Sequence, residues 1–171
     1  MNLQYIQGLW EEQRLVWGVS MRVFQAIPKD KMDAHPIAGM RTPKELIAHM
    51  AATMRTIATG VTKGAIDDYS ELEKTAIGMK HEEFVKWVAE SWTVANKAVR
   101  SLSEAQATAM VKNPWTTDFP AAVCIQILFD EHLHHRGQLY AYLRAFGVEP
   151  PFMWDFENNA KEFQPRQHQT A

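Results

Sequence analysis

The most constraining feature of this sequence is a spacing of three and four residues between apolar side chains, which recurs in four separate segments. Such a spacing gathers apolar side chains on one face of an α-helix, and no stretch of useful length alternates as a half-buried strand does. The expected helices run from about Leu3 to Ala26, from Pro43 to about Val61, from about His81 to Leu102, and from about Pro120 to Phe146. Four helices of about 20 residues without an intervening sheet predict an all-α four-helix bundle.

Local signals mark where these helices begin and what joins them. Thr42 as N-cap, Pro43 in the first helical position and Glu45 in the third form a strong helix-start signature. After the second helix, glycines and a polar run around Asp67 predict a long surface connection that reaches Met79. The bundle is therefore expected to carry long connectors.

The length of 171 residues indicates a single domain, residues 1–171. A chain of this size buries roughly 70% of the surface that it exposes when unfolded, which supports one core and leaves little for a second. Gly147 and a proline pair stop the last helix, and a C-terminal tail begins at about residue 152. The aromatic residues of this tail, Phe152, Trp154 and Phe156, are expected to pack on the bundle.

Composition and charge exclude several classes of function. The 18 lysines and arginines against 20 acids give a formal charge of −2, without the cationic excess that nucleic-acid binding requires. The only cysteine, Cys124, offers no disulfide, and its apolar helix predicts a buried, inert thiol. The most apolar run, Phe119 to Phe129, is shorter than the roughly 18 residues of a membrane span. Because the N-terminus also lacks the pattern of a secretory signal, we expect a cytoplasmic protein with no membrane and no nucleic acid among its partners.

Histidines cluster on the fourth predicted helix. At 100° per residue, Glu131 and His135 share a face beside the apolar stripe, while His134 points outward or toward a helix edge. His132 lies about 60° from His135, on the far side of the stripe. Imidazoles and a carboxylate at the border of a buried stripe are typical of metal sites in helical bundles, which a ligand on a facing helix completes. A solvated helix face is the other interpretation of this cluster.

The second predicted helix supplies one further candidate ligand, His49, beside the apolar stripe of Leu46, Met50 and Ile57. Small residues around His49 leave room for an ion or a substrate. A hydrogen-bonded histidine at the rim of the core suits this position too, so periodicity alone does not select it. The sequence contains no nucleophile elbow and no glycine-rich phosphate loop, so nucleophilic catalysis and nucleotide binding have no support.

Three residues that directly follow the cluster also need an explanation. Gly137 in mid-helix costs roughly 1 kcal/mol relative to alanine, which predicts the close approach of another backbone. Gln138 is placed either to orient a ligand or to bond a neighbouring helix. Arg136 is expected to be structural, with an ion pair to Glu131 as the alternative role for that carboxylate.

Two segments of the sequence resemble a known family. The stretch HHRGQLYAYLRAFGVEPP, together with the earlier connector IPKDKMDAHPIAGMRTPKELIAHM, looks like the DinB/YfiT-like superfamily of metal-binding four-helix-bundle proteins, the DNA-damage-inducible DinB family. The resemblance extends from about Ile27 to Pro151 and implies a DinB-like bundle. In this family one histidine on the second helix and two histidines four apart on the fourth bind a divalent metal ion. The last of these histidines immediately precedes Arg-Gly-Gln, so His49 matches the first ligand and His135 the last.

This sequence departs from the family pattern at one ligand. Glu131 stands where the family usually has histidine, so the resemblance implies a metal site of His49, Glu131 and His135. Two imidazoles and one carboxylate, with positions left open, suit one divalent ion such as Zn, Ni, Fe or Mn. The alternatives are that His132 replaces the missing imidazole as ligand, or that the site is degenerate and holds no metal.

The resemblance also suggests a function. Relatives include enzymes that activate a low-molecular-weight thiol, such as bacillithiol or mycothiol, for S-transfer or isomerisation. A metal-dependent enzyme acting on such a thiol, or on water, is therefore expected to bind a small-molecule substrate. The alternative is a non-enzymatic, stress-related helical bundle with a weak or degenerate metal site.

Relatives are commonly dimers, so a homodimer is expected. The sequence adds one argument, because the first and third predicted helices carry more tryptophan than one core obviously needs. If they face outward, these residues form an apolar patch of the kind that marks an interface, and strictly internal packing is the alternative. The candidates are Trp10, Trp17, Trp87 and Trp92.

Overall fold

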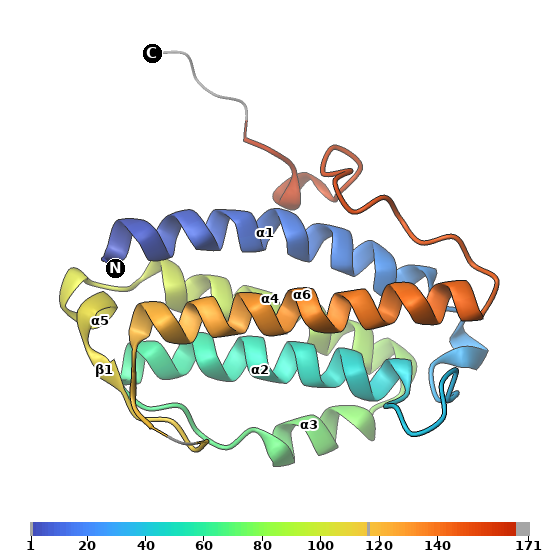
Figure 1. Cartoon of the computed structure of the whole chain (residues 1–171), viewed down its shortest axis with the longest axis horizontal. Coiled ribbons are helices and arrows are strands. Elements are labelled where there is room, and N and C mark those ends of the chain that lie inside the picture. Colours follow the sequence, from blue (N-terminus) through green and yellow to red (C-terminus); the bar gives the residue numbers. More distant parts are fainter. Residues whose placement is uncertain (1, 116, 167–171) are drawn as a thin grey trace.

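Four long helices form the body of the protein in a computed structural model that describes residues 2–115 and 117–166 (Figure 1). They are α1 (Leu3–Ala26), α2 (Pro43–Lys63), α4 (His81–Arg100) and α6 (Ala121–Ala145). Helix α6 packs between α1 and α2, and α4 closes the bundle against the same two helices. The predicted all-α bundle is confirmed, and the four expected helices begin and end within about two residues of the observed bounds. Within the described ranges, no helix combines the length and apolar character needed to cross a bilayer.

The start of α2 follows the predicted signature. The Thr42 side chain accepts a hydrogen bond from the Glu45 backbone amide at 3.2 Å, and the Glu45 carboxylate accepts one from the Thr42 amide at 2.7 Å. This capping box satisfies two amides that the first helical turn leaves without partners. It fixes the first turn of the helix that carries His49.

The tryptophans lie in the core of one bundle, so the structure follows the alternative of internal packing and these side chains form no outward patch. Trp10 and Trp17 are fully buried, and Trp87 and Trp92 are 7% and 4% exposed. The Trp10 and Trp92 rings stack with centroids 5.2 Å apart, which joins α1 to α4. The tryptophan argument for a dimer is therefore wrong, because internal packing uses these side chains. The homodimer itself stays a prediction that rests on the family resemblance.

The connections contain more regular structure than the sequence predicted. Helix α3 (Ser70–Ile77) lies within the expected surface connection and packs against α2. Its eight residues carry too few apolar positions for a periodic signal, since only Ala76 is buried. A helical turn, α5 (Glu104–Thr108), precedes two short antiparallel strands, β1 (Met110–Val111) and β2 (Phe119–Pro120). The 3-10 turns η1 (Lys29–Lys31) and η2 (Lys161–Phe163) complete the described elements.

The C-terminal tail packs on α1 mainly through residues that the sequence did not single out, and of the three expected aromatic residues only Phe156 is partly buried. Phe152 and Trp154 are 67% and 64% exposed, so the prediction for them is wrong. Instead Asn159 and Phe163 are buried, and the Asn159 amide donates a hydrogen bond to the Leu15 carbonyl on α1. In Figure 1 the chain leaves α6 and turns back along α1.

Candidate metal centre

Three ligand atoms converge between α2 and α6. His49 comes from α2, and Glu131 and His135 lie one turn apart on α6. Glu131 Oε2 is 3.1 Å from His135 Nε2 and 3.8 Å from His49 Nε2. One ligand atom from each residue lies within 4.8 Å of the others. The structure thus brings together the three residues that the family resemblance selects.

His49 is oriented by a carboxylate behind it. Its Nδ1 lies 3.0 Å from Glu73 Oε2 on α3, and the other Glu73 oxygen lies 3.4 Å from an Arg41 nitrogen. Burial raises the pKa of Glu73, but the hydrogen bond from His49 and the charge of Arg41 outweigh this effect and leave the pKa below its ordinary value. An ionised carboxylate only accepts hydrogen bonds, so His49 Nδ1 carries the proton. In the neutral imidazole, Nε2 then presents its lone pair to the centre.

The side-chain amide of Gln138 lies beside Nδ1 of His135, as Glu73 lies beside Nδ1 of His49. Gln138 Oε1 lies 3.0 Å from His135 Nδ1, while Gln138 Nε2 lies 3.2 Å from His134 Nε2. Burial lowers the pKa of His135, although Gln138 and Glu131 favour the charged form, so the neutral ring dominates at pH 7. A neutral His135 that donates from Nδ1 to Gln138 directs the lone pair of Nε2 toward Glu131.

If the outer ring nitrogens carry the protons, Nε2 of His49, Nε2 of His135 and Oε2 of Glu131 face one another as acceptors. In the other tautomer, His135 Nε2 donates a hydrogen bond to Glu131 Oε2 at 3.1 Å. In the first case, lone pairs at 3.1 and 3.8 Å repel unless a cation lies among them. Metal–ligand bonds of 2.0 to 2.1 Å in tetrahedral geometry separate ligand atoms by about 3.3 Å, close to the distance between Glu131 and His135 and shorter than the distance between Glu131 and His49. Carboxylates or amides that hold the outer nitrogen of a ligating histidine are typical of metal sites. The residues present therefore fit one divalent ion.

The centre is open on the side of Glu131. Its side chain is 47% exposed, whereas those of His49 and His135 are 10% and 14% exposed. Hollows of about 550 and 420 Å³ flank His49, and both are bordered by Arg41. Tyr69 and Trp115 form an aromatic wall, with ring centroids 6.3 Å apart. Such concave space beside the ligands is sufficient for a small organic molecule.

His132 lies on another face of α6 and does not join the cluster. It is 2% exposed, its Nε2 is 2.7 Å from Ser20 Oγ on α1, and its ring lies 5.2 Å from that of Trp17. Burial lowers its pKa to about 3. Three residues along a helix turn a side chain about 60° from the starting direction, enough here to direct it toward α1. The structure therefore gives no support to His132 as the alternative ligand.

The remaining expectations near the site have mixed outcomes. Glu131 pairs with the two imidazoles rather than with Arg136 among the described residues. Cys124 is buried, and burial raises its pKa to about 11, as expected of an inert thiol. A Cβ added to Gly137 would meet nothing within 4 Å, so the expected close backbone approach is wrong. Glu73 was missed because the helix that carries it was not predicted.

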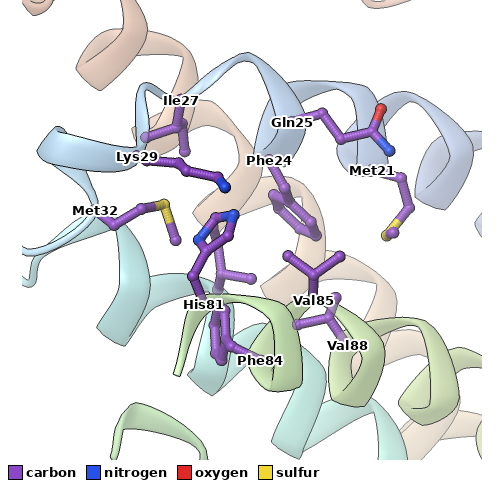
Figure 2. A pocket seen from close by; sticks show the side chains of 11 residues that line it. Met21, Phe24, Gln25, Ile27, Lys29, Met32, His81, Phe84, Val85 and Val88 are labelled. Atoms are coloured by element: carbon purple, nitrogen blue, oxygen red, sulfur yellow. The ribbon is translucent and has the colours of Figure 1, made fainter. Parts of the chain in front are cut away.

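A separate apolar pocket of about 240 Å³ lies where α1 ends and α4 begins (Figure 2). It shares no lining residue with the metal centre. Figure 2 shows the Lys29 ammonium directed toward the His81 ring, with the Phe24 ring beside them and Phe84 below. One imidazole without a carboxylate in the lining does not form a metal site.

Comparisons with known proteins agree with the observed fold. The profile of the DinB family matches residues 2–167. A crystal structure of the DinB-like protein YjoA from Bacillus subtilis superimposes with a TM-score of 0.66 at 18% identity, covering 95% of this chain and 99% of that one. A putative member of the DinB family from Exiguobacterium sibiricum gives 0.62 at 19% identity, covering 89% and 97%. No curated protein shows significant sequence similarity.

Proposed function

Because the chain belongs to the DinB family, we propose that it binds one divalent metal ion through His49, Glu131 and His135. We propose further that it is a metal-dependent enzyme that activates a low-molecular-weight thiol, for S-transfer or isomerisation, or activates water. The observation that carries the proposal is the convergence of one ligand atom from each of these three residues, all within 4.8 Å of one another. Glu73 and Gln138 hold both imidazoles in the tautomer that a ligand needs.

The chemistry follows from the ligand set and its surroundings. An ion held by two imidazoles and one carboxylate, with positions left open, would lower the pKa of a coordinated thiol or water so that the nucleophile forms near neutral pH. The closed side, at His49 and His135, keeps bulk water from the ligands, while the exposed side of Glu131 admits a substrate. Arg41, 46% exposed at the border of both hollows, is placed to attract an anionic group of that substrate.

Metal content tests the binding part of this proposal. Protein purified without a polyhistidine tag and loaded with Zn, Ni, Fe or Mn is expected to retain one ion per chain after removal of free metal. His49→Ala and Glu131→Ala are each expected to lower that stoichiometry sharply, because a site with three protein ligands has no replacement for a lost one. His134→Ala is the matched control: this exposed imidazole contacts Gln138 and the His135 ring, but it is not among the three residues whose ligand atoms converge. Full retention of metal by every single variant would contradict the proposed site.

Activity tests the enzymatic part separately. The metal-loaded protein is expected to accelerate transfer of a thiol to an electrophile, or hydrolysis, and chelation is expected to abolish the acceleration. Bound metal without turnover in either assay would contradict the enzyme and favour a metal-binding bundle instead. Thiols and electrophiles are screened with the wild type and with Glu131→Ala in parallel. The turnover that the variant lacks is the part that depends on the metal centre.

A further inference from the structure

The apolar pocket between the end of α1 and the start of α4 has no part in the proposed function (Figure 2). Its volume of about 240 Å³ is below the roughly 300–1,000 Å³ of sites for drug-sized ligands. It is nevertheless larger than a cavity of roughly 150 Å³, which is enough to bind benzene. The pocket shares no lining residue with the hollows around the metal centre. Its buried floor, at most 6% exposed, consists of Ile27, Met32, Ile47, Phe84 and Val88.

The walls of this pocket are adaptable and reach the surface. Met21 on α1 and Met32 after η1 both line it, and the unbranched side chain of methionine rearranges readily around a ligand. Val85 on α4 also lines the pocket and is 42% exposed. A small molecule can therefore enter from solvent beside Val85 and place apolar atoms against the buried floor.

The polar groups that line the pocket favour a negative charge. Figure 2 shows the exposed Lys29 side chain directed toward the His81 ring. Neither side chain has a hydrogen bond or an ion pair with another described residue, and no carboxylate lines the pocket. Glu82 and Glu83 follow His81 in the chain but lie outside the lining, and Glu83 accepts a hydrogen bond from the Lys80 backbone amide at 3.3 Å. An ammonium and an imidazole thus lie unpaired beside an apolar interior.

From these features we propose that the pocket binds a small organic carboxylate with an apolar body. The apolar body fills the interior, and the carboxylate stays at the surface, where its oxygens accept hydrogen bonds from Lys29 and from an N–H of His81. Every protonation state of an imidazole ring found near neutral pH has at least one N–H, and the ammonium supplies the opposite charge. Burial of the apolar body supplies most of the affinity, while the partly hydrated ion pair supplies selectivity for the charge. This binding does not depend on the metal centre.

Titration of octanoate into the full-length protein tests the proposal. We expect saturable binding at one site per chain without a requirement for zinc, and a rise in melting temperature, because the ligand binds only the folded state. Octylammonium, with the same chain length and the opposite charge, is expected to bind at least about threefold more weakly, since Lys29 attracts one head group and repels the other. A smaller difference, a requirement for zinc, or no saturable binding of octanoate would overturn the proposal.

The length of the ligand chain tests the limited size of the pocket. Each methylene group that becomes buried raises affinity about fourfold, so octanoate is expected to bind at least about tenfold more tightly than butanoate. Dodecanoate is expected to gain less than about fourfold over octanoate, because its additional carbons have no room in the interior. A larger gain would overturn the assignment to a small ligand.

A pair of lysine variants tests the role of the charge. Lys29→Met removes the ammonium and keeps an unbranched side chain, so the preference for octanoate over octylammonium is expected to fall below about threefold. Lys31→Met is the matched control on the same 3-10 turn, since Lys31 does not line the pocket and lies 3.4 Å from Asp30. The control is expected to keep the preference of the wild type. An unchanged preference in Lys29→Met would contradict the assignment.

Methionine methyl signals in nuclear magnetic resonance spectra locate the ligand. Octanoate is expected to shift the signals of Met21 and Met32, whereas those of Met110 and Met153, which are exposed elsewhere, stay unchanged. Val85→Trp adds a bulky ring at the pocket and is expected to weaken octanoate binding about tenfold or more, which keeps the test valid if Lys29→Met does not fold. Unshifted signals of Met21 and Met32, or undiminished binding by Val85→Trp, would contradict binding in this pocket.

Discussion

His132 and His135 lie three residues apart on α6, and the two faces that carry them offer the imidazoles different surroundings. His132 is enclosed by α1, where Ser20 engages one nitrogen and the Trp17 ring covers the side chain. His135 lies beside an open hollow, where Gln138 engages one nitrogen and an acceptor, Glu131, faces the other. The difference shows that the atoms offered to each nitrogen, rather than membership in a histidine cluster, separate a candidate ligand from a core residue.

The largest expected effect is on metal affinity at the open face. His135→Ala should lower the affinity for a divalent ion more than about 100-fold, because the loss of a direct ligand exceeds the 10- to 100-fold cost of an outer-shell change. Competition with a chromophoric chelator measures this value. The free energy of unfolding of the metal-free variant should change little, since the ring lies at the border of a hollow.

The opposite result is expected at the enclosed face. His132→Ala should lower the free energy of unfolding by about 2–4 kcal/mol, because it leaves a cavity and removes the partner of Ser20. Urea denaturation of the metal-free protein measures this change. Metal affinity should stay near that of the wild type. Loss of metal in His132→Ala together with retention in Glu131→Ala would reverse the comparison and remove the carboxylate from the ligand set.

Glu73 sharpens the comparison, since it orients a ligand without contacting the centre. Glu73→Ala should lower metal affinity about 10- to 100-fold, because Nδ1 of His49 loses its acceptor. Glu73→Gln retains an acceptor oxygen and should recover most of this loss. Chelator competition on the two variants distinguishes an orienting role from a direct one. Equal and complete loss of metal in both would contradict the orienting role.

The pH dependence of stability should distinguish the enclosed imidazole. His132 stays neutral to about pH 3, whereas a histidine in the unfolded chain takes up a proton near pH 6.5. The unfolded state therefore binds the extra proton between these values, and the free energy of unfolding falls by about 1.4 kcal/mol per pH unit as pH decreases below 6.5. This contribution is fully present above pH 6.5. His132→Gln, which does not titrate, should show a slope smaller by that amount in metal-free urea denaturation between pH 7 and 5.

The smallest expected effect concerns the outward face of α6. Gly137→Ala should raise the free energy of unfolding by about 0.5–1 kcal/mol. The added methyl group meets no other atom, and alanine gives the unfolded chain fewer backbone conformations than glycine does. Gly18→Ala is the matched helical control. A Cβ there would lie 2.4 Å from Phe163, so this variant should lose about 1–3 kcal/mol. Thermal unfolding of the two variants measures whether stability rises in Gly137→Ala and falls in Gly18→Ala.

The sequence predicts those features that depend on helical periodicity and local capping. The four long helices and the Thr42 capping box follow from spacing and side-chain chemistry within a few residues. The shared face of Glu131 and His135 follows from the same periodicity. The position of His49 relative to them needed the family resemblance, because helix pairing across the bundle leaves no local signal.

Other features lie beyond such reasoning. Helix α3 and its Glu73 depend on tertiary packing against α2, and a segment of eight residues gives too few apolar positions to reveal a period. The tail shows the same limit, since Phe163 is buried and Phe152 is exposed although both are phenylalanine. Gly18 permits the contact of Phe163 with α1, a pairing between residues far apart in the sequence.

X-ray absorption at the zinc edge tests the central claim most directly. The zinc-loaded protein is expected to show a coordination shell of nitrogen and oxygen without sulfur, with multiple scattering from two imidazoles. His135→Ala should reduce this signal to one imidazole or lose the ion, and His132→Ala should leave the signal at two. A signal from three imidazoles in the wild type, or an unchanged signal in His135→Ala, would contradict a centre built from His49, Glu131 and His135.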